Sequence, residues 1–203
     1  MRALCIVDLQ NDFMPEGPLG VSGAHAIVPI INRFIPAFSL VIATQDWHPK
    51  DHVSFAANHP GKKPGDRIPT DFGEQILWPV HCVQNTRGAE LVSDLNREKI
   101  ESVFYKGTDK EIDSYSAFFD NARRRATGLA PFLESKGAAQ LYFAGLATDY
   151  CVLYSALDAI DLGFEVFVVA DACRAVNLRL EDEQLAFAAI AAKGGKIISS
   201  KDI

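Results

Sequence analysis

Short apolar segments alternate with helix-like stretches along most of this chain, and that alternation limits its fold more than any other feature. The segments are rich in Val, Ile, Phe and Tyr, and we expect strands at residues 3–7, 40–44, 102–105, 139–144, 165–170 and 196–199. Most are continuously apolar rather than alternating, which is typical of strands covered on both faces in a parallel sheet. The sequence therefore predicts a three-layer α/β/α fold with a six-stranded, mostly parallel sheet.

The stretches between these strands predict helices over residues 24–38, 127–136, 149–162 and 181–193. Gly137, Gly163 and Gly194 directly follow three of them, where glycine commonly ends a helix. Residues 47–88 show little periodicity and are rich in Pro, Gly and His. A loop this long in a compact protein is usually functional. We expect residues 1–203 to form one domain, with a metal and substrate loop region at about 47–88.

Composition and charge exclude several classes of function. The chain has 203 residues and a net charge of −6, without a basic block, so we expect no nucleic-acid partner. The apolar run at the N-terminus is too short for an export signal, and no run approaches the ~20 residues that span a bilayer. Four scattered cysteines do not indicate a disulfide framework. We expect a cytoplasmic protein with reduced thiols and no membrane partner.

Reactive side chains follow four of the expected strands. Asp8 follows the first strand, Asp46 and His48 the second, Lys106 the third, and Cys151 comes after a short turn beyond the fourth. Ligands of parallel α/β folds bind outside the carboxyl ends of the strands. We therefore expect these residues to meet at one edge of the sheet.

Cys151 has the features of a nucleophile, because it stands at the start of an expected helix. The helix N-terminus stabilises a thiolate, and the backbone N–H groups of Ala147 and Cys151 are candidates for an oxyanion hole. Asp8 can accept the thiol proton, and Lys106 can stabilise the thiolate and keep Asp8 ionised. The alternatives are an inert buried cysteine and a structural ion pair between Asp8 and Lys106.

A second cluster of side chains has the composition of a metal site. Four of the five histidines lie between His48 and His81, and Asp46 precedes His48 by two residues. One carboxylate with two or three imidazoles, His52 being the third, suits Zn, Fe or Mn with room for water or substrate. The spacing is also compatible with ordinary surface histidines.

Three aromatic side chains fall in irregular segments near the expected edge of the sheet: Phe13, Trp78 and Tyr115. Aromatic residues in such positions can line a pocket for a flat ring. Each of them could instead serve only in packing.

Seven segments, in chain order, match a known family pattern. They are VDLQNDF (7–13), TQDWHP (44–49), HVSF (52–55), LWPVHCV (77–83), KG (106–107), DSYSAF (113–118) and GLATDYCV (145–152). With them the chain resembles the nicotinamidases, also called pyrazinamidases, of the isochorismatase-like hydrolase superfamily. The likeness covers essentially the whole chain. The TQDWHP and LWPVHCV segments distinguish nicotinamidases from metal-free relatives.

The resemblance assigns a role to each of these residues. It implies a catalytic triad of Asp8, Lys106 and Cys151. It implies one divalent metal ion, with Zn expected and Fe or Mn as alternatives. The implied metal ligands are Asp46, His48 and His81, with His52 joining in some members only. It implies a cis Leu146–Ala147 peptide bond beside the oxyanion hole and ring contacts from Phe13, Trp78 and Tyr115. Leu146 and Ala117 depart from the commoner Val and Gly of the family.

The activity that follows from the resemblance is metal-assisted hydrolysis of nicotinamide to nicotinate and ammonia in NAD salvage, with pyrazinamide as a further substrate. Monomers and homodimers both occur in the family. One alternative is an amidohydrolase of the same superfamily acting on a carbamoyl or ureido substrate, although those enzymes generally lack the metal ligands. Another is a non-catalytic metal-binding protein on the same fold, which the intact Asp8, Lys106 and Cys151 set argues against.

Overall fold

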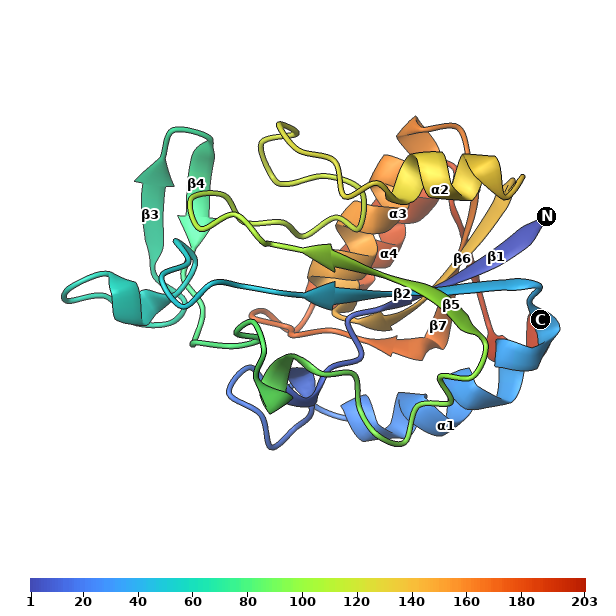
Figure 1. The fold of residues 1–203 in the computed structure, drawn as a ribbon, viewed down its shortest axis with the longest axis horizontal. Helices are drawn as coiled ribbons and strands as arrows, with labels where there is room; N and C mark the ends of the chain where they lie inside the picture. The colour runs from blue at the N-terminus through green and yellow to red at the C-terminus, as the bar shows by residue number, and fades with distance from the viewer.

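The computed structural model describes residues 1–203 and contains a six-stranded sheet in which every pair of neighbouring strands is parallel (Figure 1). The strand order is β5-β2-β1-β6-β7-β8. The strands are β1 (Arg2–Val7), β2 (Leu40–Asp46), β5 (Ile100–Lys106), β6 (Gln140–Leu146), β7 (Glu165–Arg174) and β8 (Lys196–Ile198). The predicted fold class is confirmed.

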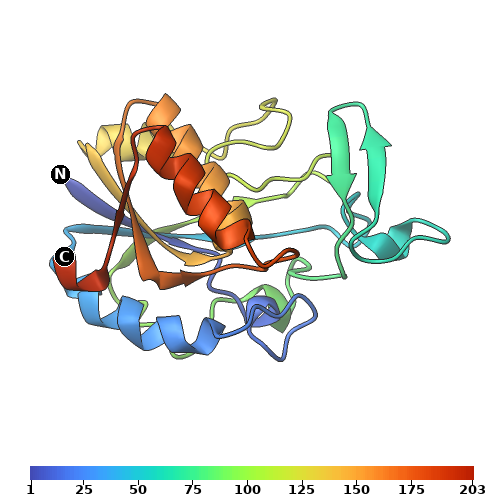
Figure 2. The same cartoon turned by 180° about the vertical axis from the view of Figure 1, so that it is seen from behind.

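Helices cover both faces of the sheet. They are α1 (Ala24–Phe34), α2 (Leu129–Ser135), α3 (Leu153–Asp161) and α4 (Asp182–Ala192). α1 covers one face, and the other three cover the opposite face, where α3 and α4 run side by side (Figures 1 and 2). None of these helices combines the length and the apolar composition that crossing a bilayer requires.

The central strand β1 shows why the apolar runs are continuous. Leu4 and Ile6 join the core beneath α1, whereas Ala3, Cys5 and Val7 join the core beneath α2 and α3. Successive side chains of a strand point to opposite faces, so a strand buried on both faces needs an apolar residue at every position.

All four helices are shorter than the sequence predicts, and two of them differ by four residues at one end. The first stops at Phe34 and continues as a 3₁₀ turn, Ile35–Ala37, because Pro36 has no N–H to extend the α-helix. The third predicted helix begins with a π-helical turn, Thr148–Val152, and becomes α-helical only at Leu153. Cys151 therefore lies in that turn, ahead of α3. The other 3₁₀ turns are Asn11–Phe13, Ala56–Asn58, Arg87–Ala89 and Ser200–Asp202.

The region 47–88 contains an element that the sequence analysis did not predict, an antiparallel hairpin of β3 (Arg67–Thr70) and β4 (Gly73–Ile76). It projects beyond the carboxyl ends of the main strands (Figure 1). Of its strand residues only Gln75 is buried. A hairpin with so little buried surface has no alternating apolar pattern, which is why the sequence did not reveal it.

Candidate active site

The structure brings together the four groups that the sequence places after successive strands. Asp8 directly follows β1, Asp46 and Lys106 are the last residues of β2 and β5, and Cys151 lies in the turn after β6. Because β5, β2, β1 and β6 are neighbours in that order, their carboxyl ends form one continuous edge. All four side chains are buried there.

Lys106 is the centre of the polar network. Its Nζ lies 2.8 Å from Oδ2 of Asp8, donates to Cys151 Sγ at 3.2 Å and to the carbonyl oxygen of Ser114 at 3.1 Å, and is also paired with Asp46. Burial alone would disfavour the ammonium, but the two carboxylates hold the pKa of Lys106 well above its usual range. The side chain is therefore a fixed positive charge between the nucleophile and both acids.

Asp8 is held in place by a second strand. The Thr44 hydroxyl donates to Asp8 Oδ1 at 2.6 Å and accepts the Asp8 backbone N–H at 3.2 Å. The backbone φ of Asp8 is +46°, in the left-handed region that residues other than glycine seldom adopt. Burial, with a further contribution from Asp46, raises the pKa of Asp8 against the opposing effect of Lys106. A carboxylate in this environment is well suited to accept a proton.

Burial also raises the pKa of the Cys151 thiol well above its usual range, and Lys106 only partly opposes this. Cys151 is buried and precedes the α-helix, and the neutral thiol that Asp8 is expected to deprotonate is therefore favoured at rest. Burial favours the neutral thiol, and the raised pKa of Asp8 makes its carboxylate a better proton acceptor. One proton passing from Cys151 to Asp8 creates the nucleophile without adding net charge to the site.

The turn that carries Cys151 also provides a backbone donor. The Leu146–Ala147 peptide bond is cis, as the resemblance implies. The Ala147 carbonyl accepts the N–H groups of Tyr150 and Val152, both at 3.1 Å, whereas the Ala147 N–H donates to no other group of the chain. Ala147 and Cys151 line the same pocket, so this N–H is available to a ligand beside the sulfur.

Asp46, His48 and His81 form a compact set of candidate metal ligands, with their ligand atoms all within 4.8 Å of one another. Asp46 Oδ2 lies 3.6 Å from His48 Nε2 and 3.8 Å from His81 Nε2. The Nδ1 atom of each imidazole lies within hydrogen-bond distance of a backbone carbonyl, Gly107 at 2.9 Å and Pro79 at 2.8 Å. A carbonyl only accepts, so Nδ1 carries the proton and Nε2 keeps its lone pair for a cation.

His52 lies against this set. Its ring centroid is 4.1 Å from that of His48, and its Nδ1 is 2.7 Å from the Ser54 hydroxyl. Its Nε2 is buried and has no hydrogen-bond partner. Burial, together with the neighbouring His48, lowers the pKa of His52 to about 4, so this ring is neutral at physiological pH. An orphaned, neutral imidazole nitrogen beside three ligand atoms fits a metal site.

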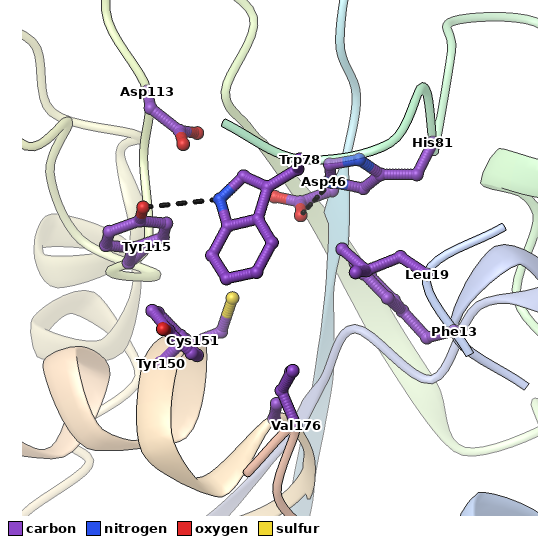
Figure 3. A pocket seen from close by; sticks show the side chains of 11 residues that line it. Phe13, Leu19, Asp46, Trp78, His81, Asp113, Tyr115, Tyr150, Cys151 and Val176 are labelled. Atoms are coloured by element: carbon purple, nitrogen blue, oxygen red, sulfur yellow. Dashed lines mark hydrogen bonds and ion pairs between the residues drawn. The ribbon is translucent and has the colours of Figure 1, made fainter. Parts of the chain in front are cut away.

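A pocket connects the nucleophile with these ligands (Figure 3). The three expected aromatic side chains, Phe13, Trp78 and Tyr115, all line it, and Trp78 Nε1 donates to Tyr115 Oη at 3.4 Å. Cys151, Asp46 and His81 also line the pocket.

The sequence analysis missed four further lining residues: Leu19, Asp113, Tyr150 and Val176. Two of these had a sequence signal, because Asp113 begins the DSYSAF segment and Tyr150 directly precedes Cys151.

Comparison with known proteins identifies the family. Residues 2–202 match the isochorismatase domain. The nicotinamidase of Acinetobacter baylyi is 44% identical over 201 residues, which cover 99% of this chain and 94% of that protein. The chain belongs to the isochorismatase family, among its nicotinamidases. It is thus an enzyme of the amidohydrolase class.

Solved structures agree with this assignment. A nicotinamidase/pyrazinamidase from Acinetobacter baumanii superposes with a TM-score of 0.96 at 44% identity, covering 99% of this chain and 97% of the other. A pyrazinamidase from Pyrococcus horikoshii in complex with zinc has a TM-score of 0.80 at 38% identity, with 98% of each chain covered. Together with the ligand set above, the zinc complex supports a divalent metal in this enzyme.

Proposed function

We propose that this enzyme hydrolyses nicotinamide to nicotinate and ammonia, with Cys151 as the nucleophile. The observation that carries the proposal is the position of Cys151. Its sulfur accepts a hydrogen bond from Lys106, which pairs with Asp8, and Cys151 lines a small pocket together with aromatic side chains. Full-length relatives named nicotinamidases support the substrate. Pyrazinamide, a ring of the same shape with the same amide, is the expected second substrate, and NAD salvage is the corresponding role.

In the first half of the reaction, the Cys151 thiol gives its proton to Asp8 and its sulfur attacks the amide carbon. The developing oxyanion accepts hydrogen bonds from the N–H groups of Ala147 and Cys151. The tetrahedral intermediate collapses as Asp8 protonates the amide nitrogen, the C–N bond breaks, and ammonia leaves a thioester on Cys151. Lys106 stays protonated throughout and stabilises the negative charge as it moves between Asp8 and the sulfur.

In the second half, Asp8 accepts a proton from a water molecule that attacks the thioester. The C–S bond breaks, the acid is released, and the proton returns to Cys151. Because Asp8 is charged at the start of each half and neutral after each attack, one carboxyl group serves as base and acid in turn. Its raised pKa suits both roles.

The metal site would serve substrate binding. Asp46, His48 and His81 would hold one divalent cation, Zn in the first instance and Fe or Mn as alternatives, with His52 as a candidate fourth ligand. When bound, the cation supplies a Lewis acid for the pyridine nitrogen. Phe13, Trp78 and Tyr115 would enclose the ring, so that its amide group lies at the sulfur of Cys151.

Ammonia release from nicotinamide tests the proposal. We expect full activity in the wild type, none in Cys151→Ala and near-normal activity in Cys173→Ala, which removes an equally buried thiol away from the pocket. Chelation should lower wild-type activity, and added metal should restore it. Equal turnover by wild type and Cys151→Ala would refute the nucleophile. A metal-loaded wild type that is inactive on nicotinamide but cleaves carbamoyl or ureido compounds would refute the substrate.

A further inference from the structure

One buried carboxylate in the pocket has no part in the proposed mechanism. Asp113 is 4% exposed and lines the pocket opposite Asp46 and His81 (Figure 3). Its Oδ1 accepts the Ser114 N–H at 2.8 Å, and its Oδ2 accepts the Gln75 side-chain amide at 2.9 Å. Both donors are neutral, and no lysine, arginine or histidine forms an ion pair with Asp113 in this chain. A buried carboxylate without a cationic partner is costly, so a cation is the expected counterpart.

The position of Asp113 indicates where that cation binds. One carboxylate oxygen of Asp113 and one nitrogen each of His48 and His52 lie within 4.8 Å of one another. His48 also belongs to the set with Asp46 and His81, so the two sets of ligand atoms meet at His48. His52 belongs to this second set, and its buried Nε2 has no hydrogen-bond partner. Two independent observations, an unpaired acid and an orphaned imidazole nitrogen, therefore point to the same place.

The charge balance of the buried cluster agrees with this placement. Asp8, Asp46 and Asp113 are three carboxylates, and Lys106 is the one positive charge among them. The three carboxylates exceed the single ammonium by two charges, which one divalent cation supplies. Transfer of the Cys151 proton to Asp8 does not alter this balance.

We propose that Asp113 is a second carboxylate of the metal site, which strengthens the binding of the divalent cation by its charge. This rests on the metal site of the proposed function and adds a residue to it. Asp113 is thus a positioning residue, because it acts on substrate only through the cation. Carboxylates that act on a metal from beyond its direct ligands typically change metal affinity by about 10- to 100-fold.

The test measures Zn²⁺ affinity rather than activity. The full-length protein is stripped of metal and titrated with Zn²⁺ against a chromophoric chelator. Asp113→Asn removes the charge and keeps the size. Asp113→Ala avoids an amide facing the Gln75 amide, which retains the Ile76 carbonyl as a partner at 2.7 Å. We expect the Zn²⁺ dissociation constant of both variants to rise about 10- to 100-fold, with cooperative unfolding retained.

Asp120→Asn is the matched control. Asp120 is also a buried carboxylate of the segment after β5, but it accepts the N–H groups of Ala122, Arg124 and Arg125 and lies outside both sets of ligand atoms. The proposal is supported if the Zn²⁺ dissociation constant rises at least threefold in both Asp113 variants and stays within threefold of wild type in Asp120→Asn. Any other pattern overturns it. His81→Ala separates the two hypotheses: if it loses Zn²⁺ while the Asp113 variants do not, only the role of Asp113 fails.

Discussion

Replacing Lys106 by Met tests whether the polar network of the active site depends on one buried charge. The substitution keeps most of the aliphatic stem and removes the ammonium that pairs with Asp8 and Asp46. Asp8 can lose its negative charge by taking up a proton, because its pKa is already raised. Asp46 loses the same partner: in the wild type Lys106 and His48 hold its pKa well below the usual range against the effect of burial, and only His48 remains in the variant. The variant therefore contains a buried carboxyl group whose main compensating charge has been removed.

An uncompensated charge of this kind lowers the free energy of unfolding by about 3–5 kcal/mol. Urea unfolding of the metal-free protein at pH 7 measures it. Lys193→Met is the control, because Lys193 Nζ lies 2.6 Å from Asp161 but both side chains are partly exposed, at 37% and 43%. Water screens that pair, so its loss should cost less than about 1 kcal/mol. If the two variants lost the same stability, the argument from burial would be wrong.

Two further predictions concern Cys151 and the strand that precedes it. In metal-free protein, iodoacetamide labelling of Cys151 should be slow at pH 7 and still rise beyond pH ~9, because the raised thiol pKa delays formation of the thiolate to higher pH. Mass spectrometry of the peptide reports it, and a labelling midpoint below pH 7 would contradict the assigned resting state. Gly145→Ala should destabilise the fold by roughly 3 kcal/mol, since its φ is +126° and a Cβ would lie 2.1 Å from the Val7 carbonyl oxygen. Gly163→Ala, at φ +89° with nothing within 4 Å, should cost about 1 kcal/mol, and equal losses in urea unfolding would refute the steric argument.

The fold and most of the site could be predicted because they depend on patterns local in sequence. Continuous apolar runs identified all six strands of the main sheet, and the residue after each strand indicated the edge where Asp8, Lys106 and Cys151 meet. The parallel sheet converts this sequence position into proximity, since every carboxyl end lies on the same side.

Features that arise from tertiary contacts could not be predicted in the same way. The hairpin of β3 and β4 has almost no buried face. The burial of Cys151, which raises the pKa of its thiol, depends on packing around the π-helical turn. Asp113 is one of many acidic residues in the sequence. It begins the DSYSAF segment, but only its burial beside His48 and His52, without a lysine or arginine partner, indicates a part in the metal site.

The position of β1 in the middle of the sheet has a consequence for how the chain folds. Its two neighbours are β2, paired from Ala3 with Leu40, and β6, paired from Arg2 with Gln140. During synthesis, β1 can acquire its first neighbour early, but its other edge stays open until about two thirds of the chain has been made. Contacts over such sequence distances form slowly, and an open apolar edge strand promotes aggregation. Nascent chains that end before β6 should therefore need chaperones. Such chains also contain no nucleophile, because Cys151 is synthesised only after β6, the strand that covers the open edge of β1.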